Sequence, residues 1–527
     1  MNWQQIIQKE VFDPLEKEFP ERPRNLAEVF QRAVETHADQ TAIVYEGQHV
    51  SFSALGDSVI KAAHVLRNQY GVEAGDRVAV LFGTEPTFAI SVWAALAIGA
   101  VVCPMNIRYL KQELQYQLEL TDPKIILLDA ELLDRILPIK GEIPSLKAIF
   151  ASMDDPPEGV YPFSVLTNGP VPEATPYRFV EETDPAFIFF TAGTTGRAKG
   201  AVNSHRSLIY SFLRARISAA GGQSSQVLCI PIPLHYTGGC KSFLGGFYSG
   251  TKCIFLKHWK IEELLEAVQE HKVTNLFALG SIWALAVASE NFSKYDLSSI
   301  QAVFYGGSST PAAVIKRISE ALPHAPQVQG YGMTECNGGT VEVDALARPT
   351  SCGMPNATTQ LRIADEDDSD LSANEVGQIL IRNAQIFSGY WKNELATEEV
   401  MRGGWYHTGD MGYQDEEGRL HIAGREKDMI IRGQENIYPA EIEAVISQHP
   451  SVGEVAVIGV PDEIFGEQVQ AIVVPRSGAE IGEEDIRQLC QEQLAGFKVP
   501  KFVQLRNQPL PRNPGGKILK RELQSSG

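Results

Sequence analysis

The stretch TAGTTGRAKG spans residues 191–200 and separates two apolar segments, 186–190 and 201–202. This order predicts a strand, a tight turn and a second strand. Its three glycines let N–H groups approach an anion, and its threonines and two cations add donors and positive charge. The spacing differs from a G-x-x-x-x-G-K-[ST] loop, and no G-x-G-x-x-G sequence follows the first strand. The stretch therefore predicts a phosphate-binding turn, with a solvated hairpin turn as the ordinary alternative.

The composition is that of a soluble globular protein with more than one domain. The chain has 527 residues, which exceeds the usual size of a single hydrophobic core. Hydrophobic residues make up 44% and charged residues 21% of it, as in ordinary globular proteins. The formal net charge of -19 disfavours a general nucleic-acid-binding or anionic-membrane-binding protein.

Cysteine usage and the apolar segments predict a cytoplasmic protein. The seven cysteines are scattered and form no CxxC pair, so we expect reduced core residues and neither a disulfide framework nor a zinc site. The N-terminal segment lacks the basic, apolar and small-residue order of a signal peptide. The longest apolar run, residues 88–105, is interrupted by Gly99 and Pro104 and predicts a buried helix and strand, with no transmembrane segment.

The order of predicted elements indicates an α/β protein. Residues 26–36 and 53–69 have helical spacing, and residues 41–45 and 77–81 resemble strands. Continuous apolar runs, typical of strands buried on both faces, occupy residues 124–128, 186–190, 226–230 and 252–256. We expect a large N-terminal α/β body with several subdomains.

The last hundred residues differ in character from the rest of the chain. They contain predicted helices at 441–448 and 483–494 and predicted strands at 455–459 and 469–474. This pattern predicts a small α+β domain with its own core. The GREKD segment at 424–428 combines a glycine with alternating charges. We therefore expect an N-terminal domain of residues 1–425 and a C-terminal domain of residues 426–527.

Four more stretches concentrate glycines and polar residues beyond what a fold requires. They are PLHYTGG (233–239), YGGS (305–308) with YGMTE (331–335), WYHTGD (405–410) and PRNPGGKILKREL (511–523). An aromatic residue beside glycines can stack on a flat base, and a Thr-Glu pair can supply a phosphate contact and an oxygen ligand for Mg²⁺. Taken singly, each stretch has an ordinary alternative as a turn, a structural histidine or a solvated terminal lysine.

In this order and at these spacings, the five segments resemble the adenylate-forming superfamily of acyl-CoA synthetases, aryl-CoA ligases, luciferases and peptide-synthetase adenylation domains. The resemblance covers residues 26–523 and is strongest to an acyl-CoA or aryl-CoA ligase. It implies an enzyme that converts a carboxylic acid and ATP to an acyl-adenylate and pyrophosphate. A thiol then takes the acyl group and AMP leaves. The implied substrates and cofactors are ATP, Mg²⁺ and coenzyme A.

The resemblance assigns most of the glycines and threonines to ATP. The turn at 191–200 matches the mobile loop that grips the β- and γ-phosphates, although Ala192 replaces a usual serine and Ala198 a usual proline. The residues implied in nucleotide binding are Thr191, Gly193, Thr194, Thr195, Gly196 and Lys199 in this loop, and Gly306, Gly307, Ser308, Tyr331, Gly332 and Met333 around the adenine.

Five further residues are implied in specific roles. Thr334 matches the α-phosphate contact, and Glu335 matches the magnesium ligand. Asp410 matches the acid that binds the ribose hydroxyls, and Arg425 matches the arginine that assists it. His235 matches the residue that gates the acyl pocket.

The resemblance also implies that the C-terminal domain moves between the two steps. Lys517 matches the catalytic lysine that reaches the carboxylate and the α-phosphate during adenylation, and Lys427 occupies the hinge position. Gly433 matches the glycine that lines the thiol tunnel after the movement. Gln434 stands where relatives often have a second glycine, which leaves the shape of this tunnel open.

The acid and the acceptor are less determined. Amino-acid-activating relatives usually carry an aspartate after the PLHYTGG-like segment, and residues 234–243 contain none, which disfavours amino acids. The expected wall of the acyl pocket is apolar and rich in glycine, which predicts a fatty or aromatic acid. It is drawn from His235, Tyr236, Gly238, Gly239, Ser281, Tyr305, Tyr331, Asn337, Gly338 and Gly339. No carrier-protein domain follows residue 523, which favours CoA as the thiol. Two alternatives stay open, a stand-alone adenylation enzyme that loads a separate carrier protein and a non-catalytic nucleotide-binding relative; a homodimer is compatible with each.

Overall fold

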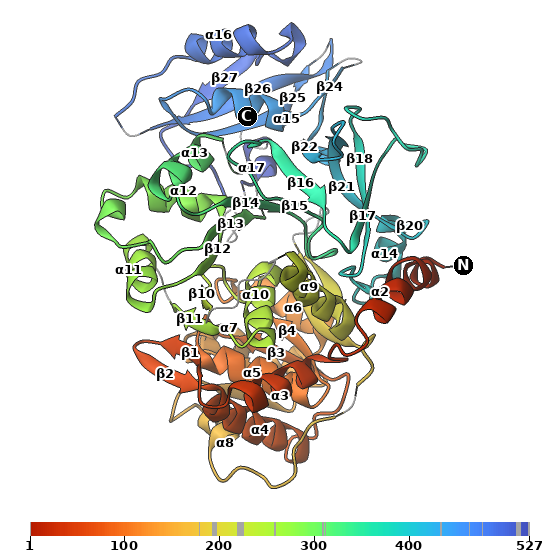
Figure 1. Cartoon of the computed structure of the whole chain (residues 1–527), viewed down its shortest axis with the longest axis vertical. Helices are drawn as coiled ribbons and strands as arrows, with labels where there is room; N and C mark the ends of the chain where they lie inside the picture. Colours follow the sequence, from red (N-terminus) through yellow and green to blue (C-terminus); the bar gives the residue numbers. More distant parts are fainter. Residues whose placement is uncertain are drawn as a thin grey trace.

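The computed structural model describes residues 2–178, 180–191, 198–218, 226–257, 260–307, 310, 312–432, 435–462, 464–476, 478–512 and 518–524. Within these residues the strands form three sheets. Figure 1 shows the C-terminal unit (blue) at one end of the long axis and helices α3 (Leu26–His37) and α4 (Phe52–Asn68) at the other. The α/β fold class expected from the sequence is confirmed.

One sheet contains the strand that leads into the TAGTTGRAKG turn. Its order is β19 (Gly389–Tyr390), β9 (Lys199–Ser204), β8 (Pro185–Thr191), β4 (Val101–Pro104), β3 (Arg77–Leu81), β5 (Ile125–Leu128), β6 (Ala148–Ala151) and β7 (Tyr161–Pro162). Strands β8 and β9 pair antiparallel, with Thr191 opposite Lys199. Both predicted strands are therefore present, and the turn between them, residues 192–197, lies outside the described residues.

The larger sheet carries most of the other predicted site residues. Its order is β17 (Thr359–Ala364), β18 (Gly377–Asn383), β21 (Trp405–Gln414), β22 (Leu420–Arg425), β16 (Ser351–Pro355), β15 (Thr340–Glu342), β14 (Gln327–Tyr331), β13 (Ala302–Gly306), β12 (Asn275–Leu279), β10 (Val227–Cys229), β11 (Lys252–Phe255), β1 (Thr41–Tyr45) and β2 (Gln48–Ser51), with β20 (Met401–Arg402) beside β21. Strands β14, β13, β12, β10, β11 and β1 are parallel, so their carboxyl ends lie at one edge.

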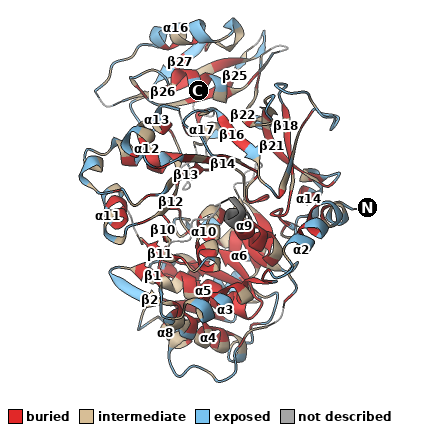
Figure 2. Cartoon of the chain, in the orientation of Figure 1, coloured by how far each residue is buried: buried red, intermediate tan, exposed pale blue. Residues whose placement is uncertain are grey.

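Helices pack on both faces of the two large sheets. One hydrophobic core is shared by both sheets and contains residues of α3, α4, α5 (Pro86–Ala97), α9 (His205–Ser218) and α10 (Thr237–Tyr248). The outer faces are covered by α11 (Ile261–His271), α12 (Gly280–Ala288) and α13 (Ala312–Ala321) on the larger sheet, and by α6 (Lys111–Thr121) and α7 (Leu133–Ile136) on the other. Figure 2 shows the buried residues concentrated in these layers.

Local signals explain where the helices of the shared core begin. The Asn25 side chain accepts a hydrogen bond from Glu28 N at 3.0 Å at the start of α3, and Ser51 Oγ accepts one from Ala54 N at 3.1 Å at the start of α4. Helix α5 is buried throughout much of its length, and its Trp93 ring stacks on Phe30 at 4.9 Å. The apolar run at 88–105 is thus a core helix and strand, and none of the described helices is long and apolar enough to cross a membrane.

Before α3, the chain forms three short helical segments that the sequence did not lead us to expect. They are α1 (Trp3–Ile7), a π-helical turn (Gln8–Phe12) and α2 (Asp13–Glu18). The Arg206 guanidinium of α9 lies 3.5 Å from the centroid of the Phe12 ring and donates to Gln8 Oε1 at 2.7 Å. These contacts hold the segment against the body.

The C-terminal unit has its own sheet and core. The sheet order is β24 (Glu435–Ile437), β23 (Ile430–Arg432), β26 (Gly466–Pro475) and β25 (Val452–Asp462), with β27 (Phe502–Leu505) beside β26. Helices α15 (Pro439–Ile446) and α16 (Glu483–Gln493) pack on one face, and α17 (Lys520–Gln524) contacts β25. The chain leaves the larger sheet at Arg425 and enters this one at Ile430.

All seven cysteines lie in the described part of the chain, where each is buried and unpaired. Burial raises the pKa of Cys229 and of Cys253 to about 12, so these thiols stay protonated at neutral pH. They are core residues, as the sequence predicted.

Candidate active site

The candidate site lies at the carboxyl ends of the parallel strands β13 and β14, where turns and strands from four segments converge. Two of its glycines are required by close backbone approach. A Cβ on Gly306 would lie 2.7 Å from the Gly330 carbonyl oxygen, and a Cβ on Gly332 would collide with the Gly338 backbone. Gly307 has a φ of +77°, which favours glycine. These glycines therefore let neighbouring backbone segments pack closely at this end of the strands.

Asp410 is a buried carboxylate held by two donors. It lies on β21, opposite Arg425 on β22 in the strand register. Arg425 Nε is 2.9 Å from Asp410 Oδ1, and the Tyr331 hydroxyl donates to Asp410 Oδ2 at 2.8 Å. Burial and the Asp410 charge raise the pKa of Tyr331 well above its usual range, which keeps Tyr331 a neutral donor. The structure thus joins three of the predicted residues in one hydrogen-bonded group.

Glu335 is a second buried carboxylate, in the loop that follows β14. The Tyr390 hydroxyl of β19 donates to Glu335 Oε1 at 2.9 Å, and Phe387 N donates to the Glu335 carbonyl at 2.7 Å. Burial raises the pKa of the Glu335 carboxyl, and the Tyr390 hydrogen bond opposes this shift. The positive charges of Arg425 and Lys199 also lower the pKa of Glu335, so both cations lie near its carboxylate.

Helix α10 brings a second set of polar groups to the same loop. Thr237 Oγ1 donates to Thr334 Oγ1 at 3.1 Å, and one turn later Lys241 Nζ donates to the Asn337 carbonyl at 2.5 Å. Asn337 has a φ of +50°, so Lys241 holds a backbone carbonyl in a turn that few side chains favour. Helix α10 therefore fixes the loop that carries Thr334 and Glu335.

His235 lies just before α10 and is buried. Its ring packs on Tyr236 with centroids 4.2 Å apart, and its Nε2 has no hydrogen-bond partner among the described residues. Burial, reinforced by Arg108, lowers the pKa of His235 to about 3. At neutral pH this imidazole is therefore uncharged, which fits a group that lines a pocket better than a proton donor.

Between α10 and the larger sheet is an apolar surface that is only partly covered. Phe277, Phe304 and Val328 occupy aligned register positions on β12, β13 and β14 and are each half-buried, whereas their chain neighbours are buried. A Cβ built on Gly238 of α10 would lie 3.6 Å from the Phe277 ring. These half-buried side chains form an apolar wall, and Gly238, which follows the Thr237 that donates to Thr334, lies beside Phe277.

Tyr305 does not contribute to this wall. The sequence suggested it as part of the acyl pocket, but Tyr305 alternates with Phe304 along β13 and packs in the core formed with α12 and α13 on the other face. Sequence reasoning also missed Tyr390, Phe277 and Phe304.

Several predicted residues lie outside the described part of the chain. They are Gly193, Thr194, Thr195 and Gly196 of the phosphate loop, Ser308, Gly433 and Lys517. The two ends of the loop are described: Thr191 Oγ1 donates to the Lys199 carbonyl at 3.5 Å, and Lys199 Nζ lies 4.8 Å from the centroid of the Tyr390 ring. Lys199 therefore shares a neighbour with Glu335.

The carboxylates present fit a magnesium ion that arrives with phosphates. In the described residues no group of three or more His, Cys, Asp or Glu side chains is arranged to hold a metal ion. Glu335 is a single buried carboxylate beside Thr334. Mg²⁺ commonly binds one or two protein carboxylates together with substrate phosphates, so Glu335 fits this mode and not an all-protein site.

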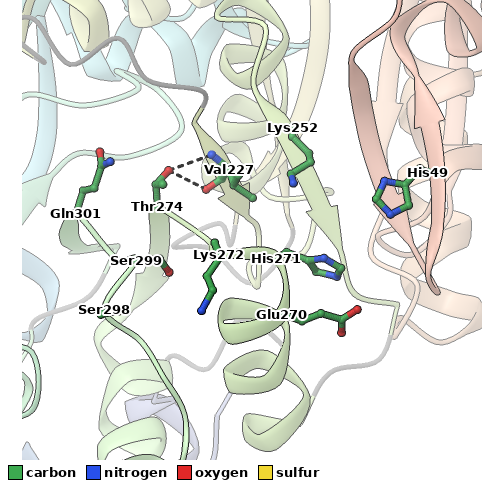
Figure 3. A pocket seen from close by; sticks show the side chains of 10 residues that line it. All are labelled: His49, Val227, Lys252, Glu270, His271, Lys272, Thr274, Ser298, Ser299 and Gln301. Carbon is green, nitrogen blue, oxygen red and sulfur yellow. Dashed lines mark hydrogen bonds between the residues drawn. The ribbon is translucent and has the colours of Figure 1, made fainter.

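A separate hollow of about 770 Å³ lies at the opposite edge of the larger sheet (Figure 3). Val227 and Lys252, at the starts of β10 and β11, line it together with His271 and Lys272 at the end of α11. Lys272 pairs with Asp296 at 2.8 Å. Because parallel strands begin here, this hollow is separate from the site built at their carboxyl ends.

Comparison with known proteins agrees with the resemblance to adenylate-forming enzymes that the sequence motifs indicated. Residues 30–391 match the family model described as AMP-binding enzyme, and residues 441–517 match the AMP-binding enzyme C-terminal domain. A long-chain-fatty-acid–CoA ligase of Escherichia coli O157:H7 is 30% identical over 96% of this chain and 95% of its own length. A feruloyl-CoA synthase of an Amycolatopsis species is 31% identical over 92% of this chain and 95% of its own.

Solved structures of similar proteins share the whole architecture. ATP-bound MatB from Rhodopseudomonas palustris superposes with a TM-score of 0.86 at 30% identity and covers 95% of this chain and 99% of its own. The anthranilate CoA ligase AuaEII, in complex with anthranoyl-AMP, has the same fold, with a TM-score of 0.88 at 24% identity over 95% and 97% of the two chains. The family models and the full-length relatives together show that this chain is an enzyme of the AMP-binding family.

Proposed function

We propose that this protein is an ATP-dependent carboxylic acid:CoA ligase. It forms an acyl-adenylate and pyrophosphate and then an acyl-CoA and AMP. The observation that carries the proposal is the pair of buried carboxylates, Asp410 and Glu335, at one edge of the larger sheet beside Thr334. The relatives named as acyl-CoA and aryl-CoA ligases, similar over nearly the whole chain, support the choice of reaction.

In the first step, Asp410 accepts hydrogen bonds from the ribose hydroxyls of ATP. Its two oxygens each bind one protein donor and keep lone pairs for further donors. Arg425 orients the carboxylate, and Gly306, Gly307 and Gly332 contact the adenine. The phosphates then extend toward Thr334 and the loop that ends at Lys199.

The acid approaches the α-phosphorus along the apolar wall. Its carboxylate oxygen forms a bond to the α-phosphorus, and the bond to pyrophosphate breaks. Because the carboxylate and the phosphates of ATP are both anions, positive charge must offset their repulsion. Lys199 and Lys517 of this chain supply it. Glu335 would hold Mg²⁺, which when bound neutralises phosphate charge. Thr334, fixed by Thr237, donates to an α-phosphoryl oxygen.

The wall of Phe277, Phe304 and Val328 favours a fatty or aromatic acid. Its members are apolar and only half-buried, so an apolar chain or ring that covers them gains about 25 cal/mol for each Å² removed from water. A neutral His235 at the pocket adds no charge that would select a second anionic group.

In the second step, the thiol sulfur of CoA attacks the carbonyl carbon of the adenylate. The thiol gives up its proton to solvent, and AMP leaves with the electron pair of the broken anhydride bond. Lys517 must vacate the site before the thiol arrives, so we propose that residues 426–527 rotate as a domain about residues 426–428. Burial and the nearby Arg425 lower the pKa of Lys427 in this segment. After rotation, Gly433 lines the passage for the thiol.

A panel of carboxylic acids tests the proposal directly. Purified enzyme is incubated with ATP, Mg²⁺ and each acid, and pyrophosphate exchange and AMP release are measured with and without CoA. We expect acid-dependent exchange without CoA and stoichiometric AMP and thioester formation with it, for fatty or aromatic acids. Exchange without any CoA-dependent turnover would favour a separate carrier protein as acceptor. Absence of exchange with every acid would favour a non-catalytic nucleotide-binding protein.

A further inference from the structure

Tyr390 makes three contacts that join the two ends of the candidate phosphate site. Its hydroxyl donates to Glu335 Oε1 at 2.9 Å, and the face of its ring lies 4.8 Å from Lys199 Nζ. Its backbone, in β19, pairs with Ala201 of β9, the strand that starts at Lys199. One buried side chain thus touches both the carboxylate and the lysine that the proposed function places around the phosphates of ATP.

From these contacts we propose that Tyr390 is a positioning residue that sets the spacing and orientation of Glu335 and Lys199. The inference rests on the proposed function, because it takes Glu335 to hold magnesium and Lys199 to hold phosphate. Tyr390 itself touches neither the magnesium ion nor the phosphates in this proposal. It acts through these two side chains.

The hydroxyl accounts for the first half of this role. A carboxylate that binds a metal usually accepts a hydrogen bond that fixes its plane. Glu335 is buried, so water cannot supply that bond, and Tyr390 supplies it. The Glu335 backbone is fixed independently by Phe387 N, so the Tyr390 hydroxyl acts on the carboxylate alone.

The ring accounts for the second half. An ammonium over an aromatic face is attracted by the negative face of the ring. Because β19 also pairs with β9, the backbone of Tyr390 is held beside the strand that carries Lys199. The ring edge packs against Phe387 at a centroid distance of 5.0 Å, and the Tyr390 amide donates to Thr397 Oγ1 at 2.8 Å. These contacts keep the ring from rotating away.

Two substitutions separate the hydroxyl from the ring. Tyr390→Phe removes the hydrogen bond to Glu335 and keeps the ring, whereas Tyr390→Leu removes both. Tyr70→Phe is a control, because the Tyr70 ring also packs against another ring, that of Tyr161, at 5.5 Å. Tyr161 is in β7, at the opposite edge of the sheet from β19 and Tyr390. Thermal unfolding of each variant measures any loss of fold.

Calorimetry of ATP binding, with and without Mg²⁺, is the deciding measurement, and pyrophosphate exchange at varied Mg²⁺ accompanies it. We expect Tyr390→Phe to weaken ATP binding about ten- to a hundredfold in Mg²⁺ only, and to raise the half-saturating Mg²⁺ concentration by a similar factor. Tyr390→Leu should weaken binding in EDTA as well. Tyr70→Phe should match the wild type in both.

The results distinguish this inference from the proposed function. If wild-type enzyme catalyses no pyrophosphate exchange, the proposed function fails, yet calorimetry still tests Tyr390. A Tyr390→Phe enzyme that binds ATP with the wild-type dependence on Mg²⁺ overturns the positioning role. Equal weakening with and without Mg²⁺, together with a lower melting temperature, also overturns it, because that result is the one expected of a purely structural tyrosine.

Discussion

Replacing Asp410 by asparagine should weaken the use of ATP by about 10- to 150-fold in kcat/KM. Asp410 Oδ1 accepts from Arg425 and Oδ2 from Tyr331, which leaves lone pairs on both oxygens for the ribose hydroxyls. Asparagine keeps the shape but turns one acceptor into a donor, so at least one charge-assisted bond to the ribose is lost. Such a bond is worth roughly 1.5–3 kcal/mol, which gives the stated factor at about 1.4 kcal/mol for each tenfold.

The cost to stability should be smaller than the cost to ATP use. The Tyr331 hydroxyl can donate to the amide oxygen of the variant, so it keeps a partner. The Arg425 side chain is one-third exposed, so water compensates part of the charge that loses its carboxylate. We therefore expect a folded variant with a modestly lower melting temperature.

The assay is acid-dependent pyrophosphate exchange at saturating acid, with ATP, 2′-deoxyATP and 3′-deoxyATP varied in turn. Wild-type enzyme should prefer ATP to both deoxy analogues. In Asp410→Asn this preference should largely disappear for at least one of them, because the contact that detected the hydroxyl is gone. An unchanged kcat/KM for ATP, or undiminished discrimination against both analogues in the variant, would refute the assignment of Asp410 to the ribose.

Other substitutions test the remaining parts of the site. Gly238→Leu should narrow the range of acids that the enzyme activates, measured across an acid panel. Gly239→Ala should instead lower the melting temperature, because a Cβ on residue 239 would lie 2.5 Å from the Pro233 carbonyl oxygen. Lys517→Ala should cut pyrophosphate exchange by about 10²–10³ and spare thioester formation from supplied acyl-adenylate, and Gly433→Leu should do the reverse; equal loss of both steps in both variants would contradict domain rotation. Burial lowers the pKa of His205 to about 3, so below pH 6.5 the unfolded chain binds a proton that the folded one does not. Between pH 6 and 4 this difference lowers the free energy of unfolding by about 1.4 kcal/mol for each pH unit, and His205→Asn should remove that contribution. Urea titrations at several pH values measure it, and the same pH dependence in the variant and the wild type would refute the assignment.

The fold class and the strands next to the site were readable from the sequence because their signals are local. The apolar run at 186–190 is bounded by a turn rich in glycine, and the structure has β8 there, extended by one residue at each end. In the C-terminal unit the predicted strand at 455–459 is longer than expected, since β25 runs from Val452 to Asp462. The extra residues include Gly453 and Pro461, which local propensity assigns to turns, and pairing with β26 overrides it.

The parts of the site that the sequence did not reveal depend on distant contacts. Tyr390 is 55 residues from Glu335, and nothing in the GYW segment around it indicates a buried carboxylate as its partner. Phe277 and Phe304 lie in apolar segments, and the approach of Gly238 of α10 to the Phe277 ring arises only from the fold. A continuous apolar run cannot show which face of a strand is covered.

The position of Arg425 connects nucleotide binding with the proposed rotation. It is the last residue of β22, and its charge acts on Glu335 on one side and on Lys427 on the other. The adenylate carries the same ribose through both steps, so a contact to that ribose must survive the movement between them. Asp410 binds Arg425 across the β21–β22 register and keeps it with the larger sheet. If Asp410 holds the ribose, the chain can pivot only after Arg425, and the single-turn helix Glu426–Asp428 is the first segment that belongs to neither sheet.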